Sequence, residues 1–125
     1  VGEVKNIANQ TLVALLAQGK IHLIPSLGYS EKGDLLNINA DYLARAVAIS
    51  LGAKKLILMT DVKGVLENDQ VLEHLNFVDV QKKIDSGVVT GGMIPKIQSA
   101  VQTVQAGVEQ VIIGDNLTDG TIIKE

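Results

Sequence analysis

The chain has 125 residues, of which 46% are hydrophobic and 20% charged, a composition typical of one globular domain and unlike that of disordered proteins. The formal net charge is −3 and the Lys and Arg residues are scattered instead of clustered, so we expect no nucleic-acid partner. The absence of cysteine excludes disulfides and thiolate metal sites, and no apolar run is long enough to span a membrane. These features predict a cytoplasmic protein without membrane contact.

Short aliphatic runs without polar alternation predict three buried strands, at residues 21–24, 55–59 and 110–113. Apolar residues between these runs recur with helical spacing. The predicted helices run from a cap at Asn6 or Asn9 to Gly19, across 43–51, across about 79–86 and across about 93–106. Polar residues at 31–34 and 67–70 predict hairpin turns.

Strands that alternate with helices of this length indicate crossover connections and an α/β fold. We expect a three-layer αβα sandwich around a mostly parallel open sheet. In such sheets, ligands bind in the loops at the carboxyl ends of the strands. Three segments in such positions therefore carry the candidate chemistry.

The first candidate segment is Asn37-Ile-Asn-Ala-Asp41. Asn39 is a natural helix N-cap, and Asp41 falls in the first turn, where the helix dipole favours an anion. Asp41 and Arg45 are also spaced for an ion pair on the helix surface. Alternatively, the loop presents two amides and a carboxylate to a ligand. Asn37, which the cap does not need, favours this second interpretation.

The second candidate segment, Thr60-Asp-Val-Lys-Gly-Val-Leu66, directly follows the predicted strand at 55–59. Asp61 and Gly64 suit an ordinary turn, in which the aspartate bonds its own backbone and the glycine takes a positive φ. Its place at a strand end also makes the segment a candidate for covering the base and ribose of a nucleotide.

The third candidate segment, Thr90-Gly-Gly-Met-Ile-Pro-Lys96, opens the last predicted helix. Paired glycines allow close approach of a ligand, and a helix N-terminus attracts an anion. Helical side chains lean toward the N-terminus, so Lys96 can reach back over the helix start. The pattern is not a Walker A loop. An ordinary turn with a solvated lysine and a phosphate site suited to phosphoryl transfer both explain these residues.

Together, the order and spacing of the three segments resemble the amino-acid kinase family. The resemblance includes Leu51-Gly-Ala-Lys-Lys-Leu-Ile-Leu-Met-Thr-Asp-Val-Lys-Gly-Val-Leu66 and extends over essentially the whole chain from Val1. The Asn-Ile-Asn-Ala-Asp and Gly-Gly-Met-Ile-Pro-Lys segments are most similar to the branch that phosphorylates N-acetyl-L-glutamate in arginine biosynthesis. They are less similar to the branches that act on carbamate, uridylate, aspartate or glutamate.

This resemblance implies ATP and N-acetyl-L-glutamate as substrates, with Mg²⁺ bound through the nucleotide and no separate metal site. Lys96 would neutralise charge on the transferring phosphoryl group, Asp41 would position the catalytic lysines, and Asn37 would hold the acyl-amino-acid substrate. The residues implied to hold the adenosine portion of ATP are Thr60, Asp61, Val62, Lys63, Gly64, Val65, Leu66, Val88, Val89 and Thr90.

The chain departs from the family at both ends. Family members begin with a strand that carries a lysine, followed by glycine-rich loops, and residues 1–125 contain no counterpart. We therefore expect 1–125 to be a single nucleotide-binding lobe, the C-terminal half of such a kinase, which lacks its N-terminal substrate lobe and transfers no phosphate alone. The family's longer stretch before the closing Gly-Thr-x-Ile is also shortened here, to 115–119, so a helix is expected to be missing.

The resemblance further implies a homo-oligomer at full length. Two other functions fit the same residues. One is a kinase of this fold that phosphorylates carbamate, glutamate, aspartate or uridylate. The other is a non-catalytic nucleotide-sensing module, which would need only the 61–66 region. The presence of Asn37, Asp41 and Lys96 together favours the enzyme.

Overall fold

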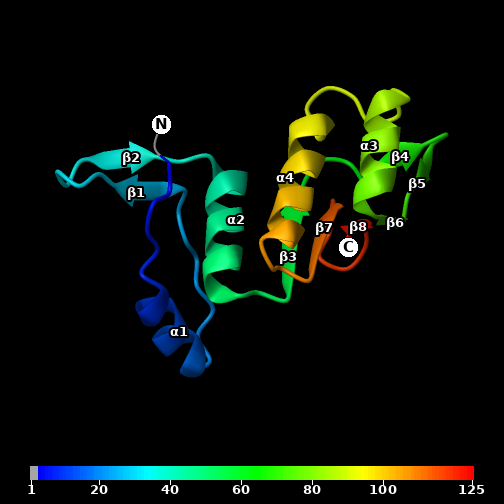
Figure 1. Ribbon diagram of the computed structural model, residues 1–125. Coiled ribbons are helices and arrows are strands. Elements are labelled where there is room, and N and C mark those ends of the chain that lie inside the picture. Colours follow the sequence, from blue (N-terminus) through cyan, green and yellow to red (C-terminus); the bar gives the residue numbers. More distant parts are fainter. Residues whose placement is uncertain (1–2) are drawn as a thin grey trace. The chain divides into compact units, whose positions relative to one another are not determined.

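The computed structural model describes residues 3–125, which fall into two compact units divided after Leu51. The first unit contains, in chain order, α1 (Asn9–Ala17), β1 (Leu27–Tyr29), β2 (Leu35–Asn37) and α2 (Ala40–Leu51). The second contains β3 (Lys55–Met59), β4 (Leu66–Glu67), β5 (Gln70–Val71), β6 (His74–Leu75), α3 (Phe77–Asp85), α4 (Met93–Gln105), β7 (Gln110–Gly114) and β8 (Thr121–Ile123) (Figure 1). None of the described helices is long and apolar enough to cross a membrane.

The predicted cap of the first helix is wrong. Ala8 occupies the cap position without a side-chain hydrogen bond, and Asn9 is already the first helical residue. The side-chain amide of Asn9 instead donates to the backbone carbonyl of Ser50, at 2.7 Å. Carbonyls in the last turn of a helix lack intrahelical partners, so this bond satisfies one end of α2 and ties α1 to it.

The predicted strand at 21–24 is also wrong, because these residues belong to no strand. The side chains of Ile21 and Leu23 are 92% and 95% exposed. A strand exists only where a neighbouring backbone pairs with it, and no described segment does so here. The aliphatic pattern therefore shows that these residues would suit a buried strand, but it does not show that a neighbouring strand is present to pair with them.

The predicted hairpin turn at 31–34 is confirmed between β1 and β2, which pair antiparallel. Ser30 closes the turn in two ways. Its backbone N–H donates to the carbonyl of Asp34, at 2.9 Å, and its hydroxyl oxygen accepts from the N–H groups of Lys32 and Asp34. This short hairpin leads directly into α2.

The second unit is built on a four-stranded sheet with the order β3-β7-β8-β6. The β3–β7 and β6–β8 pairings are parallel, whereas β7 and β8 pair antiparallel. Helix α4 packs against β7 and β8, and α3 packs against α4. The predicted fold class is confirmed as mixed α/β, with a mostly parallel sheet flanked by helices.

The core of the second unit lies between this sheet and the two helices. The strands contribute alternate residues to it, because successive side chains of a strand point to opposite faces. The buried members of this core are Leu58, Val65, Leu75, Val80, Val89, Ile97, Ala100, Val104, Val111, Ile113 and Ile123. The strands predicted at 55–59 and 110–113 are present as β3 and β7, the latter one residue longer. Strand β7 is buried as predicted, whereas in β3 only Leu58 is buried.

Helices α3 and α4 confirm the segments predicted from periodicity. Helix α4 ends at Gln105, just before Gly107. Helix α3 begins at Phe77, two residues before the predicted start, because the Asn76 side chain caps it by accepting from the N–H of Asp79, at 2.9 Å. The predicted turn at 67–70 is confirmed between β4 and β5, where Asn68 and Asp69 both have positive φ.

The connection between β7 and β8 contains no helix, as expected from its length. The Asn116 side-chain oxygen organises this loop by accepting from the N–H groups of Thr118, at 2.8 Å, and Asp119, at 2.7 Å. This compact loop lets β8 return antiparallel beside β7.

Candidate functional site

The loop 60–66 leaves the end of β3 and is anchored at both ends. The N–H of Thr60 donates to the carbonyl of Gly114 at the end of β7, at 2.9 Å. The N–H of Val65 donates to the hydroxyl oxygen of Thr121 in β8, at 2.8 Å. Gly64 has a φ of +150°, and a Cβ there would lie 2.7 Å from the same hydroxyl oxygen. Glycine is therefore required for the loop to pass so close to β8.

The segment 88–90 follows the end of α3. Val89 is 2% exposed, and its N–H donates to the carbonyl of Lys83, at 3.0 Å. Val88 is half-buried and Thr90 is exposed. The carbonyl of Thr90 then accepts from the N–H of Met93, which leads the chain into α4. The buried side chain of Val89 thus holds the segment against the core, while Thr90 remains at the surface.

The start of α4 is open around its two glycines. Gly91 has a φ of +54°, whereas Gly92 has an ordinary φ of −66°, and a Cβ at either position would meet no atom within 4 Å. Pro95 lies in the first turn, where its missing N–H costs nothing, as predicted. Lys96 follows it and is half-buried. The fold therefore does not require glycine at position 92, which is exposed at the start of the helix.

Sheet topology brings these segments to one edge of the second unit. Strands β3 and β7 are parallel, so both end at the same edge. Helix α4 packs along β7 and returns to it through the short segment 106–109, so α4 begins at that edge too (Figure 1). The predicted adenosine-binding residues and Lys96 therefore lie at the carboxyl edge of the sheet, where ligands of α/β proteins bind.

Asn37 and Asp41 lie in the first unit, on either side of the start of α2. The predicted cap is confirmed, because the Asn39 side-chain oxygen accepts from the N–H of Tyr42, at 3.1 Å. Asp41 falls in the first turn of α2. Asn37 ends β2, opposite Leu27, and its exposed side chain makes no hydrogen bond within the described part of the chain. Asn37 and Asp41 therefore lie near each other in the first unit, whereas Lys96 belongs to the second.

Sequence reasoning missed Thr121 as a residue that shapes the site. Its side chain is fully buried and holds the loop 60–66 through Val65. The only signal in the sequence was the closing Gly-Thr-Ile-Ile, which by itself does not reveal that β8 lies beside β7. Across residues 3–125, no group of three or more His, Asp or Glu side chains is placed to hold a metal ion.

A model of the amino acid kinase family matches residues 1–115. An acetylglutamate kinase from Streptococcus mutans is 59% identical over 123 residues, which cover 98% of this chain and 50% of that protein. The crystal structure of a protein from Streptococcus mutans UA159 is 58% identical with a TM-score of 0.87, covering 98% of this chain and 50% of that one.

A second solved structure is N-acetylglutamate synthase from Neisseria gonorrhoeae, complexed with coenzyme A and N-acetyl-glutamate. It is 27% identical with a TM-score of 0.90 and covers 100% of this chain and 32% of that one. The chain spans about half the length of the acetylglutamate kinases it matches. With nearly its whole length matched by the family model, the chain belongs to the amino acid kinase family.

Proposed function

We propose that this chain is the ATP-binding half of an enzyme that phosphorylates the side-chain carboxylate of N-acetyl-L-glutamate, a step of arginine biosynthesis in the cytoplasm. The observation that carries the proposal is the 59% identity to an acetylglutamate kinase along 98% of the chain. The convergence of loop 60–66, segment 88–90 and Lys96 at one edge of the sheet supports a nucleotide site within this half.

The chemistry of the proposed reaction suits the residues present. A carboxylate is already ionised at neutral pH, so it attacks the γ-phosphate of ATP without a general base. The enzyme must bring two anions together in line and offset the charge on the equatorial phosphate oxygens. A lysine side chain and the N-terminus of a helix can both supply positive charge for this purpose. Helix α4 offers both, because its N-terminus follows Gly92 and Lys96 lies in its first turns.

The proposed role of each residue is the one that the resemblance to the amino acid kinase family implies. Lys96 would stabilise the transferring phosphoryl group from the first turns of α4. Asp41 would organise lysines near that group, because a carboxylate is not needed as a base. Asn37, whose exposed amide has donors and an acceptor to offer, would bind the acyl-amino-acid substrate. Loop 60–66 and segment 88–90 would hold the adenosine portion of ATP.

Mg²⁺ would enter with the nucleotide phosphates. The described residues offer no carboxylate cage for a metal ion, and Mg²⁺ commonly keeps substrate phosphates and water as ligands. When bound, the ion would offset phosphate charge. Asp61, whose side-chain oxygen accepts from the Thr60 hydroxyl at 3.2 Å, is engaged within loop 60–66.

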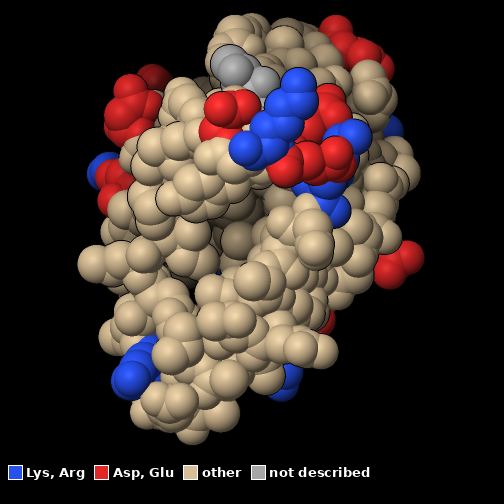
Figure 2. All heavy atoms as spheres, turned by 90° about the vertical axis from the view of Figure 1, so that its left-hand side faces the viewer, with Lys and Arg blue, Asp and Glu red and all other residues tan. Residues whose placement is uncertain are grey.

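A further lobe of the protein would complete the first unit. Ile21 and Leu23 are almost fully exposed in a segment without strand partners, and the lower part of the face drawn in Figure 2 is mostly uncharged. The Nε2 atom of His22 is shielded from solvent without a hydrogen-bond partner in residues 3–125. A strand from the half of the relatives' length that this chain does not span would cover this apolar segment and pair with its backbone.

The test is ADP release from Mg-ATP by the full gene product, with N-acetyl-L-glutamate, glutamate, aspartate and carbamate compared as acceptors. We expect turnover with N-acetyl-L-glutamate alone. Turnover with another acid would support the kinase mechanism but refute the assignment of N-acetyl-L-glutamate as the substrate. For the 125-residue chain by itself, we expect weak nucleotide binding and no acyl phosphate.

A nucleotide-sensing module is the second candidate. The same fold occurs in a protein named as a synthase, with a TM-score of 0.90, so the fold by itself does not require kinase activity. ATP binding by the full gene product without turnover on any acceptor would select this function over the kinase.

A further inference from the structure

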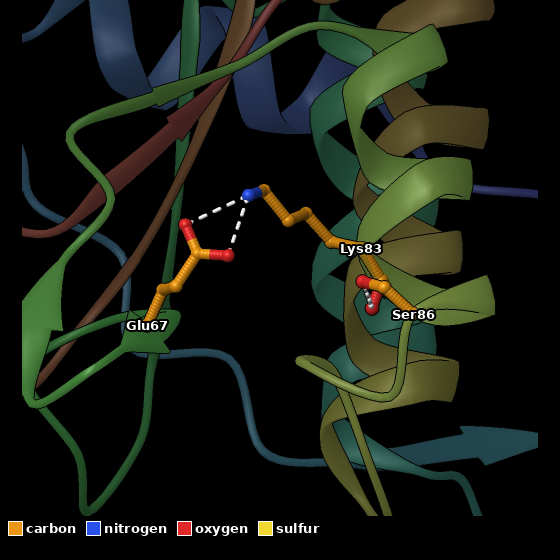
Figure 3. Close-up of polar contacts among 3 residues, drawn as sticks. All are labelled: Glu67, Lys83 and Ser86. Atoms are coloured by element: carbon orange, nitrogen blue, oxygen red, sulfur yellow. Dashed lines mark hydrogen bonds and ion pairs between the residues drawn. The ribbon is translucent and has the colours of Figure 1, made fainter.

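An ion pair joins the end of strand β4 to the last turn of helix α3. The Nζ atom of Lys83 lies 2.7 Å from both carboxylate oxygens of Glu67 (Figure 3). The two side chains are only 26% and 31% exposed, so solvent screens the pair less than it would an open surface pair. Asp79 stands one helical turn before Lys83, yet the ammonium group reaches across to β4. The ion pair therefore links strand β4 to helix α3, instead of joining two residues of the same helix.

Both partners adjoin the segments proposed to hold adenosine. Glu67 directly follows Leu66, the last residue of loop 60–66. Lys83 holds segment 88–90 through its backbone, because its carbonyl accepts from the N–H of Val89, at 3.0 Å. Lys83 is thus linked to loop 60–66 through the ion pair with Glu67, and to segment 88–90 through its own backbone carbonyl.

The strand that carries Glu67 has few other attachments. Strands β4 and β5 contain two residues each, and so short a hairpin has little stability of its own. Val65, just before it, is fastened to Thr121 and also accepts from the N–H of Leu72. After Val65, the polar contact between β4 and α3 in the described part of the chain is the Glu67–Lys83 ion pair.

We propose that Glu67 and Lys83 are positioning residues for the nucleotide, whose ion pair sets the spacing between loop 60–66 and segment 88–90. This inference rests on the proposed function, since it assigns the two segments to one adenosine site. Neither side chain is required to touch the nucleotide. Loss of the pair lets β4 and α3 separate slightly, and contacts made jointly by the two segments weaken.

The experiment is an NMR titration of the 125-residue chain with ATP, together with urea unfolding of each variant. Lys83→Met removes the charge but keeps the length of the side chain and the carbonyl that binds Val89. We expect Lys83→Met and Glu67→Gln each to weaken ATP binding by about threefold to tenfold, as expected for a partly shielded pair. The double variant is expected to be no weaker than either single one, because both remove the same interaction.

Two variants test whether the pair itself is responsible. The exchanged pair Glu67→Lys with Lys83→Glu is expected to recover most of the ATP affinity. Lys82→Met, which removes the neighbouring exposed lysine of α3, is expected to leave the affinity unchanged. In the parent chain, we expect ATP to shift the amide signals of Val65 and Val89 together, and in the single variants to shift them less.

The outcomes separate this inference from the proposed function. If the parent chain binds ATP and Lys83→Met binds it equally well, the positioning role is wrong and the nucleotide site stands. If ATP affinity falls only in proportion to the loss of folding stability, and the exchanged pair does not restore it, the pair is merely structural and the inference is overturned. If the parent chain binds no ATP, this inference is overturned, and if the full gene product binds none either, the proposed function is overturned as well.

Discussion

Thr121 and Val65, 56 residues apart in the sequence, meet in the core, where the threonine hydroxyl oxygen accepts from the valine N–H at 2.8 Å. Thr121 is fully buried and Val65 is 2% exposed, so water does not compete for the bond. Through it, the first residue of β8 holds the loop that leaves β3. The candidate site thus depends on a strand at the far end of the chain.

Replacement of Thr121 by Val would leave the Val65 N–H buried without an acceptor. We expect a loss of about 1–3 kcal/mol in the free energy of unfolding, the usual cost of such an unsatisfied donor. Thr121→Ser keeps the acceptor and loses one buried methyl group, at a cost of about 1 kcal/mol. Hydrogen exchange of the Val65 amide distinguishes the two, since it should accelerate only in Thr121→Val. Equal protection in both variants would contradict the role of the hydroxyl.

Gly92→Ala separates ligand approach from folding. An alanine Cβ at position 92 meets no atom, and the backbone is ordinary, so we expect the free energy of unfolding to stay level or to rise by about 0.4–1 kcal/mol. ATP binding is expected to weaken, because the methyl group occupies the space at the helix start. Gly91→Ala is the contrasting variant, since its positive φ should cost about 1 kcal/mol. Unchanged ATP affinity in Gly92→Ala would remove the case for a phosphate there.

Lys96→Ala tests charge stabilisation in the transition state. In the full gene product, we expect turnover to fall by about a hundredfold or more, while ATP affinity changes by about threefold or less. The reason is that charge on the equatorial oxygens rises during transfer, so the ammonium contributes most at that stage. Steady-state kinetics with an ATP titration measures both quantities, and Lys54→Ala provides an exposed-lysine control in the same unit. Equal losses in turnover and affinity would refute the role.

Ile21 and Leu23 test the proposed further lobe. The double variant Ile21→Thr, Leu23→Thr should leave the stability of the 125-residue chain within about 0.5 kcal/mol, because both side chains are exposed. In the full gene product, where we expect these side chains to be covered, the same change should cost about 1.5–3 kcal/mol per side chain. Urea unfolding of both proteins provides the comparison. Leu117→Thr, exposed in the β7–β8 connection, should have equally small effects in both.

The segments that the sequence predicted correctly are those governed by local physics. Strands β3 and β7 are aliphatic runs flanked by polar residues, and α4 carries a helical stripe that ends before Gly107. The Asn39 cap needs only its own helix. The same pattern reasoning failed at 21–24, because an aliphatic run fits a strand but does not supply the strand beside it.

The same distinction between local sequence signals and long-range contacts applies to the candidate site. Its segments were visible as motifs, because glycines, a helix start and a strand end leave local signatures. The sequence alone thus determined the α/β class, the main elements and the residues at the strand ends. Only the tertiary structure decided that β8 pairs with β7 and β6, that Thr121 fastens the loop at Val65, and that Lys83 pairs with Glu67 instead of Asp79. The physical reason is that each of these choices depends on a hydrogen-bond or charge partner distant in sequence, which local propensity cannot specify.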